Sequence, residues 1–408
     1  MTDVEQHALQ LLEHLAKARH ETRFVGGAVR DKLLGIPFSD VDLATTAHPD
    51  VVTEVLAGAG IKVVPTGIAH GTVTAVVAGK GFEITTLRRD IETDGRHAVV
   101  AYTDDWQEDA ARRDFTMNAL SRDAAGKIYD YFGGLDDAHA GRVKFVGDAS
   151  ARMNEDALRL LRFFRFYAWY AKEEPDEQTL RALEFAAPTL KNLSRERVWK
   201  ETKRLLSAPN PSDAWMLMLR HHIVSQFFPE ATNLKTLCNL LSYEHARQAG
   251  QHFNPLLRMA ALLHGQKIDA NALKERFAFS SDETQKLAQF LKNPLGTKGD
   301  GRGETDVTTL SFALHRYGLD LTEEFLVLSM AKGVQFNWES ARGVLEKWEP
   351  KTFPLKGDDV LALLSHVGLP PGPRVGEILH AVEAWWVAQN FVPDHAACIE
   401  KAKSLIQN

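Results

Sequence analysis

Two aspartates one residue apart, Asp40 and Asp42 in the segment SDVDLAT, have the spacing that most clearly suggests chemistry in this chain. Side chains on a β-strand alternate between its two faces, so both carboxylates should point the same way. Two adjacent carboxylates repel each other unless a cation lies between them. Mg²⁺ binds oxygen ligands and leaves coordination positions open for phosphate oxygens. The pair therefore predicts a site for a phosphate compound that is held through a metal ion.

The residues just before this pair suit the same compound. Gly26 and Gly27 follow a short apolar run, and glycines let the backbone approach a phosphate closely. A helix that starts after them would add N–H donors and a favourable dipole, and Arg30 would add a forked cation. We predict a strand, a glycine turn, a short helix and a second strand over residues 24–46, which together describe a metal-bound nucleoside triphosphate. A DxD pair or a glycine pair alone is more often an ordinary turn, so the specificity of the pattern comes from their order.

Composition and charge narrow the class of protein. A chain of 408 residues is long enough for two to four domains, and its 44% hydrophobic content is ordinary for a soluble globular protein. No apolar run reaches the roughly 18–20 residues that a membrane span needs, so we expect no membrane partner. Cys238 and Cys398 lack metal-ligand spacing, and we expect buried thiols in a reducing cytoplasm. The net charge of −6 argues against strong non-specific binding of nucleic acid, although residues 152–165 and 191–204 are basic.

The hydrophobic pattern changes character along the chain. A helix is expected over residues 48–59, and three strands of a small sheet are expected at residues 61–67, 70–79 and 81–89. Residues 90–102 are polar and contain glycine, which predicts a loop. Residues 108–123 predict a helix with one basic edge, and from Ala151 onward the apolar spacing is almost entirely helical. The fold class is therefore an α+β head with a small mixed sheet, followed by an all-α region.

The chain is expected to form a head followed by three helical parts. We predict a head over residues 1–145, a neck over 146–208, a body over 209–293 and a tail over 306–408. Glycine and charged residues between the body and the tail indicate a linker.

Several motifs resemble one known family. GGAVRD and DVDLAT, in this order, resemble the head domain of the DNA polymerase β-like nucleotidyltransferases, in particular class II tRNA CCA-adding enzymes and bacterial poly(A) polymerases. RRDFTMNAL at residues 112–120 matches the second motif of that family, and EDALR at 155–159 matches its base-reading motif. RERVWKE at 195–201 resembles a further motif that braces the base-reading helix. The resemblance spans nearly the whole chain and weakens beyond residue 210.

The resemblance implies roles for individual residues. Asp40 and Asp42 would hold the metal ions, and Glu83, on a neighbouring strand, would assist them. Residues 90–102 resemble the flexible loop of relatives that add the complete CCA or the terminal A. The remaining implied site residues would bind the nucleotide: Gly26, Gly27, Arg30 and Arg113 at the triphosphate, Asp114 near the sugar, Asp156 and Arg159 at the base, and Arg162 and Arg165 at phosphates or the RNA end.

The base-reading role agrees with elementary chemistry. Asp156, Arg159 and Arg162 are spaced by three residues, which predicts one face of a helix. A carboxylate acceptor beside an arginine donor complements the amino group and ring nitrogen of both cytosine and adenine. Uracil and guanine would place a carbonyl against the carboxylate and an N–H against the arginine. Such mismatched polar groups cost free energy when they are buried. A row of helical ion pairs, with Glu155 bonded to Arg159, is the structural alternative.

The resulting hypothesis is a tRNA nucleotidyltransferase that adds or repairs CCA from CTP and ATP with Mg²⁺ and without a nucleic-acid template. A poly(A) polymerase, an enzyme that adds only the terminal A, and an inactive RNA-binding scaffold are the alternatives. The oligomeric state does not follow from the sequence.

Overall fold

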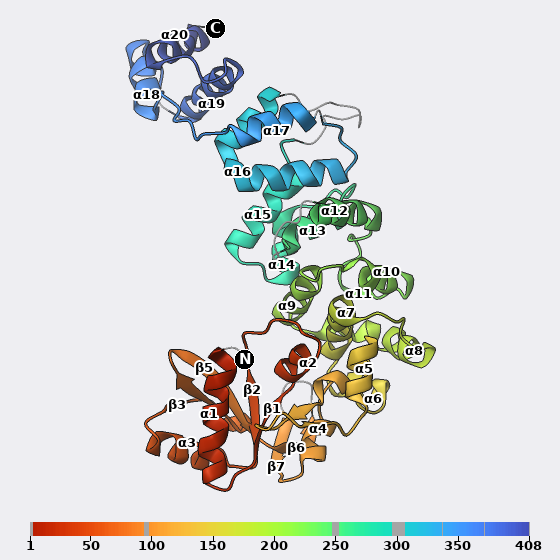
Figure 1. The fold of residues 1–408 in the computed structure, drawn as a ribbon. Helices are drawn as coiled ribbons and strands as arrows, with labels where there is room; N and C mark the ends of the chain where they lie inside the picture. The colour runs from red at the N-terminus through yellow and green to blue at the C-terminus, as the bar shows by residue number, and fades with distance from the viewer. Residues whose placement is uncertain are drawn as a thin grey trace. The chain divides into compact units, whose positions relative to one another are not determined.

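The computed structural model describes residues 3–93, 98–246, 253–295, 307–336, 338–370 and 372–407 (Figure 1). The chain divides into two compact units. The first contains Met1–Ala231 with Arg276–Ala278, and the second contains Thr232–Glu275 with Phe279–Asn408. The finer division into head, neck, body and tail stays a prediction.

Within the described residues, the first unit begins with a seven-stranded mixed sheet in the order β3-β4-β5-β2-β1-β8-β9. Its strands are β1 Thr22–Val25, β2 Asp42–Thr45, β3 Lys62–Gly67, β4 Thr72–Val77, β5 Lys80–Thr86, β8 Ser121–Arg122 and β9 Ile128–Tyr129. β2 and β5 pair in parallel, and this register sets Asp42 opposite Glu83. The α+β fold class predicted for this part is confirmed.

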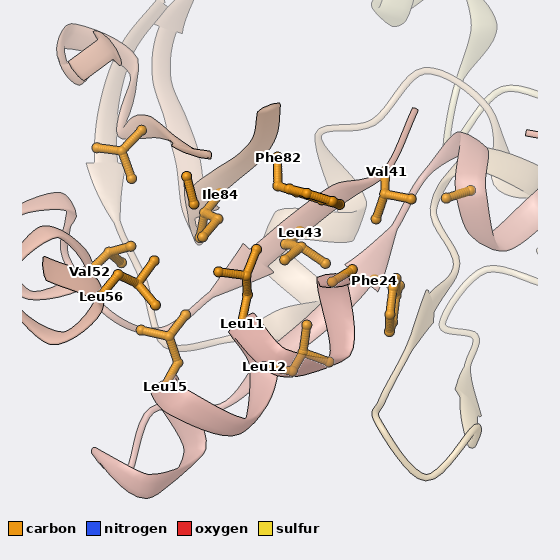
Figure 2. Close-up of a cluster of buried hydrophobic side chains, with 14 of the residues drawn as sticks. Leu11, Leu12, Leu15, Phe24, Val41, Leu43, Val52, Leu56, Phe82 and Ile84 are labelled. Atoms are coloured by element: carbon orange, nitrogen blue, oxygen red, sulfur yellow. The ribbon is translucent and has the colours of Figure 1, made fainter. Parts of the chain in front are cut away.

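Helices α1 (Asp3–Lys17) and α3 (Pro49–Gly58) cover one face of the sheet (Figure 1). Leu11 and Leu15 lie one turn apart on α1 and are fully buried against the alternating side chains of β2 and β5 (Figure 2). The side chains in contact include Leu43 and Ile84. Each such burial contributes about 1.5–3 kcal/mol. The core therefore fixes β2 and β5, the two strands that carry Asp42 and Glu83.

The region around the glycines differs in one respect from its prediction. β1, α2 (Gly27–Leu33) and β2 follow in the predicted order. Asp42 is the first residue of β2, however, and Asp40 lies before the strand begins. The prediction that both aspartates share a strand is therefore wrong, because strand pairing with β1 and β5 starts only at Asp42.

Two further secondary-structure predictions are wrong. Residues 90–93 and 98–102 are not a loop, since β6 (Arg88–Thr93) and β7 (Ala98–Tyr102) pair as an antiparallel two-stranded sheet. Residues 94–97 of the predicted loop lie outside the described residues. β-Branched residues in these two segments favour extended backbone, which the polar composition obscured. The helix expected over 108–123 stops early, because α4 covers only Trp106–Ala111 and a short 3-10 turn, η2, covers Thr116–Asn118. The side chain of Asp114 accepts the Phe115 N–H at 2.9 Å, a local bond that competes with a continuing helix.

Two short helical elements, η1 Ile68–His70 and α5 Gly134–Ala140, lie before the region that was predicted to be helical. From there on the first unit is helical, as predicted, with α6 Ala149–Glu155, α7 Leu158–Tyr170, α8 Glu177–Ala186, η3 Ala187–Asn192, α9 Arg195–Leu206, α10 Ser212–Arg220 and α11 Val224–Phe227. α7 packs against α9. The ring of Phe163 on α7 also stacks on the ring of Phe145, which lies between α5 and α6, with centroids 5.6 Å apart.

The second unit is helical in its described residues. Its helices are α12 Leu234–Ala246, α13 Pro255–Leu262, most of α14 Ala270–Phe277, α15 Ser281–Lys292, α16 Val307–Ala331, α17 Trp338–Glu346, α18 Gly357–His366, α19 Pro373–Ala388 and α20 His395–Gln407. Most of the predicted linker at 293–306 lies outside the described residues. No described helix is both long enough and apolar enough to span a membrane.

A steric constraint at Gly134 yields the first prediction. A Cβ at Gly134 would overlap the backbone carbonyl of Thr116 in η2. Gly134→Ala should therefore lower stability by about 1–3 kcal/mol or more, because backbone cannot rotate away as a side chain can. Gly58→Ala is the matched control, because nothing lies within 4 Å of a Cβ there. Urea unfolding of both variants measures the difference, and equal stability of the two would contradict the packing described.

Candidate active site

A pocket in the first unit brings together almost all the predicted site residues. It is lined by Gly26, Gly27, Arg30, Asp40, Asp42, Arg113, Asp114, Asp156, Arg159, Arg162 and Arg165. Glu83 does not line it but lies opposite Asp42 on the neighbouring strand. Segments separated by more than a hundred residues in the sequence thus meet at one cavity.

One wall of the pocket is acidic. The pKa of Asp42 is raised, first by partial loss of hydration and then by the negative charges of Glu83 and Asp40, although Arg113 opposes this. Asp40 and Asp42 both remain exposed. The three carboxylates thus repel one another in the free protein. A cation bound between them would remove that repulsion.

This donor set fits a metal ion that arrives with its substrate. Carboxylate oxygens are the ligands that hard divalent cations prefer. Among the described residues, no group of three or more His, Cys, Asp or Glu is placed to enclose a metal by protein ligands alone. Mg²⁺ is commonly bound by one or two carboxylates and completed by water and substrate phosphates, so an open carboxylate pair suits it.

The glycine turn lies beside the acidic wall. Gly26 precedes α2 with a φ of 66°, a left-handed conformation that favours glycine. A Cβ at this position would lie 3.3 Å from Nη1 of Arg113. Gly26 therefore both permits the turn and leaves room for an arginine of the pocket.

Arg30 is buried and largely engaged by the protein itself. Its Nε and Nη2 atoms donate to the Asp31 carboxylate at 2.9 and 3.0 Å, and Nη2 also donates to the Tyr170 hydroxyl at 2.7 Å. Its Nη1 atom donates to Asn118. Burial, first of all, raises the pKa of Tyr170 to about 12, so the hydroxyl stays neutral. Arg30 therefore connects α2 to η2 and to α7, in addition to lining the pocket.

Asp109 and Asp114 hold the arginines of the adjoining wall. The buried carboxylate of Asp109 accepts Arg112 Nη2 at 2.7 Å and Arg113 Nη2 at 3.1 Å. Burial alone would raise the pKa of Asp109, but the two guanidinium groups outweigh it and lower the pKa. Asp114 is also buried, and burial alone would raise its pKa. The charge of Arg162, with hydrogen bonds from Asn118 and the Phe115 N–H, outweighs burial and lowers the pKa.

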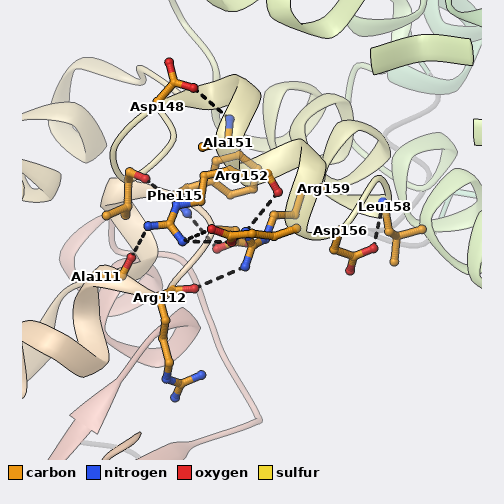
Figure 3. Close-up of polar contacts among 12 residues, drawn as sticks. Ala111, Arg112, Phe115, Asp148, Ala151, Arg152, Asp156, Leu158 and Arg159 are labelled. Atoms are coloured by element: carbon orange, nitrogen blue, oxygen red, sulfur yellow. Dashed lines mark hydrogen bonds and ion pairs between the residues drawn. The ribbon is translucent and has the colours of Figure 1, made fainter. Parts of the chain in front are cut away.

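Asp156, Arg159 and Arg162 were predicted to share one face of a helix, but Asp156 lies outside the helix. Asp156 has extended backbone (φ −152°, ψ 108°) and lies between α6 and α7, so it does not share a helix face with Arg159 and Arg162. Its Oδ1 atom accepts the Leu158 N–H at 3.0 Å, which ends one helix and starts the next (Figure 3). Both Asp156 and Arg159 nevertheless line the pocket.

The four predicted site residues between positions 156 and 165 each have an ion-pair partner within the protein. Arg159 forms the ion pair with Glu155 that the structural alternative predicts, and it donates to the Arg112 carbonyl at 3.4 Å (Figure 3). Arg165 pairs with Glu201 at 3.0 Å, and burial, only partly offset by Glu201, lowers its pKa to about 10. Glu201, the acid of the RERVWKE motif, thus contacts α7.

Sequence reasoning missed several residues of this site. No role is predicted from the sequence for Asp109, Asp31, Asn118 or Tyr170, and each of them bonds to an arginine that lines the pocket. Arg112, Phe166 and Arg204 line the pocket as well. Asp31 and Asn118 lie inside the motifs GGAVRD and RRDFTMNAL, and Asp109 stands four residues before Arg113 in a helical segment, so these three carried a signal, whereas Tyr170 did not.

The chain is similar to known proteins over almost its whole length. A family model described as Poly A polymerase head domain matches residues 22–144, and one described as Probable RNA and SrmB- binding site of polymerase A matches 174–235. The chain is 34% identical to the mitochondrial CCA tRNA nucleotidyltransferase 1 of Mus musculus, over 93% of this chain and 86% of the relative. It is 33% identical to a CCA-adding enzyme of Streptococcus pneumoniae strain G54, over 93% and 92% of the two chains. The crystal structure of the Bacillus stearothermophilus CCA-adding enzyme in complex with CTP matches with a TM-score of 0.77, at 28% identity and full coverage of both chains.

The raised pKa of Asp42 yields a prediction about stability. A raised pKa means that the folded protein holds this proton more tightly than the unfolded chain does, so ionisation of Asp42 opposes folding above that pKa. Without divalent ions, Asp42→Asn should therefore melt at a higher temperature than the parent at pH 7–8. The difference should shrink as the pH falls through the raised pKa and Asp42 becomes protonated.

Thermal melts at several pH values test this expectation. Glu54→Gln, which neutralises an exposed carboxylate on α3, is the control and should not change the melting temperature. Added Mg²⁺ should stabilise the parent more than Asp42→Asn. A lower melting temperature of Asp42→Asn at pH 8 without metal would show that the carboxylates do not repel each other as described.

Proposed function

Because this chain belongs to the family of CCA tRNA nucleotidyltransferases, or CCA-adding enzymes, we propose that it adds or repairs the 3′-terminal CCA of tRNA from CTP and ATP without a nucleic-acid template. The observation that supports this most is the single pocket in which Asp40 and Asp42 face a set of arginines and Asp156. Such a pocket would offer a metal site, triphosphate contacts and a base-reading pair within one cavity.

The proposed cofactor is Mg²⁺. Members of this family use divalent metal ions, and the exposed carboxylates of Asp40 and Asp42 are the residues that would hold them. A bound divalent ion would help ionise the attacking hydroxyl and would neutralise charge on the leaving pyrophosphate. Glu83, opposite Asp42, would add negative charge that favours ion binding.

The chain's own residues would position the two reactants. The glycine turn at Gly26 and Gly27 would let the triphosphate lie close to the backbone, and Arg113, already held by Asp109, would contact a phosphate. The tRNA 3′-hydroxyl would attack the α-phosphate in line, forming a phosphodiester and releasing pyrophosphate. Because Asp109 holds Arg113 before the substrate arrives, little reorganisation is needed at this step.

Asp156 and Arg159 would select the base. Asp156 would accept the amino group that cytosine and adenine share, and Arg159 would donate to the neighbouring ring nitrogen. Both residues keep bonding capacity for this, since a carboxylate has about four lone-pair positions and a guanidinium five N–H donors. Asp114, Arg162 and Arg165 would complete the wall toward the sugar and the RNA end. A cytoplasmic location remains a prediction.

An assay with three RNA substrates tests the proposed function. Purified protein, Mg²⁺ and single labelled nucleotides are supplied with a tRNA transcript lacking CCA, a transcript ending in CC, and an RNA without a tRNA fold. We expect CMP on the first transcript, AMP on the second, and little transfer to the third.

The other outcomes each identify a different activity. Long AMP tails on the unfolded RNA would indicate a poly(A) polymerase. AMP on the CC transcript without CMP on the first would indicate an enzyme that adds only the terminal A. No pyrophosphate release with any RNA would indicate an inactive RNA-binding scaffold and would contradict the proposal.

A further inference from the structure

We propose that Arg197 is a positioning residue that sets nucleotide selectivity by fixing the orientation of the Asp156 carboxylate. The inference rests on the proposed base-reading role of Asp156. Arg197 does not line the pocket, so it would act through Asp156 and not by touching the nucleotide.

The two oxygens of Asp156 have separate partners. Nη2 of Arg197 donates to Oδ2 at 2.6 Å, and the backbone N–H of Leu158 donates to Oδ1 at 3.0 Å. One bond comes from α9 and the other from the first turn of α7. Two fixed donors on different oxygens define the plane of the carboxylate, whereas either bond alone would leave it free to rotate.

Arg197 is itself held in place. It is half-buried in the first turn of α9, and the next residues, Val198 and Trp199, are buried. One turn further on, Glu201 forms an ion pair with Arg165 of α7, with Oε2 and Nε 3.0 Å apart. α9 is therefore joined to α7 by packing and by the Glu201–Arg165 ion pair, and it is joined to the residue that precedes α7 by the Arg197–Asp156 ion pair.

The orientation of Asp156 decides which base edge it can accept. A carboxylate held by two donors keeps lone pairs for the amino group of cytosine or adenine, and it stays an acceptor. A carboxylate without Arg197 could rotate away from the base edge. It would then no longer oppose the carbonyl of uracil or guanine, so the penalty that excludes UTP and GTP would be lost.

The other half of the base-reading pair has a different partner. Arg159 is held by Glu155 and by backbone carbonyls of Arg152 and Arg112. Arg197 forms no bond to Arg159 among the hydrogen bonds and ion pairs of the described residues. Removing Arg197 should therefore affect Asp156 selectively, and a double-mutant cycle can separate the two.

The experiment measures kcat/KM for CTP, UTP, ATP and GTP on tRNA transcripts that lack CCA or end in CC. Arg197→Met should lower the CTP/UTP and ATP/GTP selectivity ratios about tenfold or more, and Arg197→Lys should restore part of the loss. Lys200→Met is the matched control. It is an exposed residue on the same helix, does not line the pocket, and should leave both ratios within about twofold of the parent.

The double variant gives the decisive comparison. If Arg197 acts through Asp156, Arg197→Met added to Asp156→Ala should change the ratios no further. Unchanged selectivity in Arg197→Met, or additive losses in the double variant, would overturn the inference. Should Arg197→Met fail to fold in a thermal melt, the same comparison is made with Arg197→Lys and Arg197→Gln. Absence of any CMP or AMP transfer by the parent would instead contradict the proposed function itself.

Discussion

Repulsion among carboxylates beside one parallel strand pair is the constraint on which this site depends. β2 and β5 set Asp42 opposite Glu83, and Asp40 lies two residues before Asp42. The buried core beneath these strands prevents the carboxylates from moving apart at low cost, since packed side chains resist small shifts. The protein therefore keeps a negative charge that Arg113 offsets in part and that a bound cation would balance further.

The ion pairs of the arginines on the adjoining wall explain why this charge is only partly neutralised within the protein. Asp109 holds Arg112 and Arg113, and Glu201 holds Arg165. An arginine with its own buried or half-buried carboxylate is less able to collapse onto Asp40 and Asp42. The pocket can thus present acidic and basic walls at the same time, which is what a metal-bound triphosphate requires.

Much of this organisation follows from local sequence, and the exceptions have physical causes. The α+β head, the helical remainder and the gathering of most site residues could be predicted, because strand alternation, helical spacing and the ordered motifs all agree. The extended backbone at Asp156 could not be predicted, because a single hydrogen bond between its side chain and the Leu158 N–H outweighs the helical propensity of the surrounding residues. The hydrogen bond from Arg30 to Tyr170 joins residues 140 positions apart, and a single sequence gives no information on such a distant contact.

The most direct test of the account is the rate of a single CMP transfer to a tRNA transcript lacking CCA, measured across Mg²⁺ concentrations for the parent and for Asp42→Asn. If the acidic wall anchors the ion beneath the triphosphate, the rate for Asp42→Asn should be lower by about a hundredfold or more even at saturating Mg²⁺. A rate within about twofold of the parent at every Mg²⁺ concentration would contradict the account.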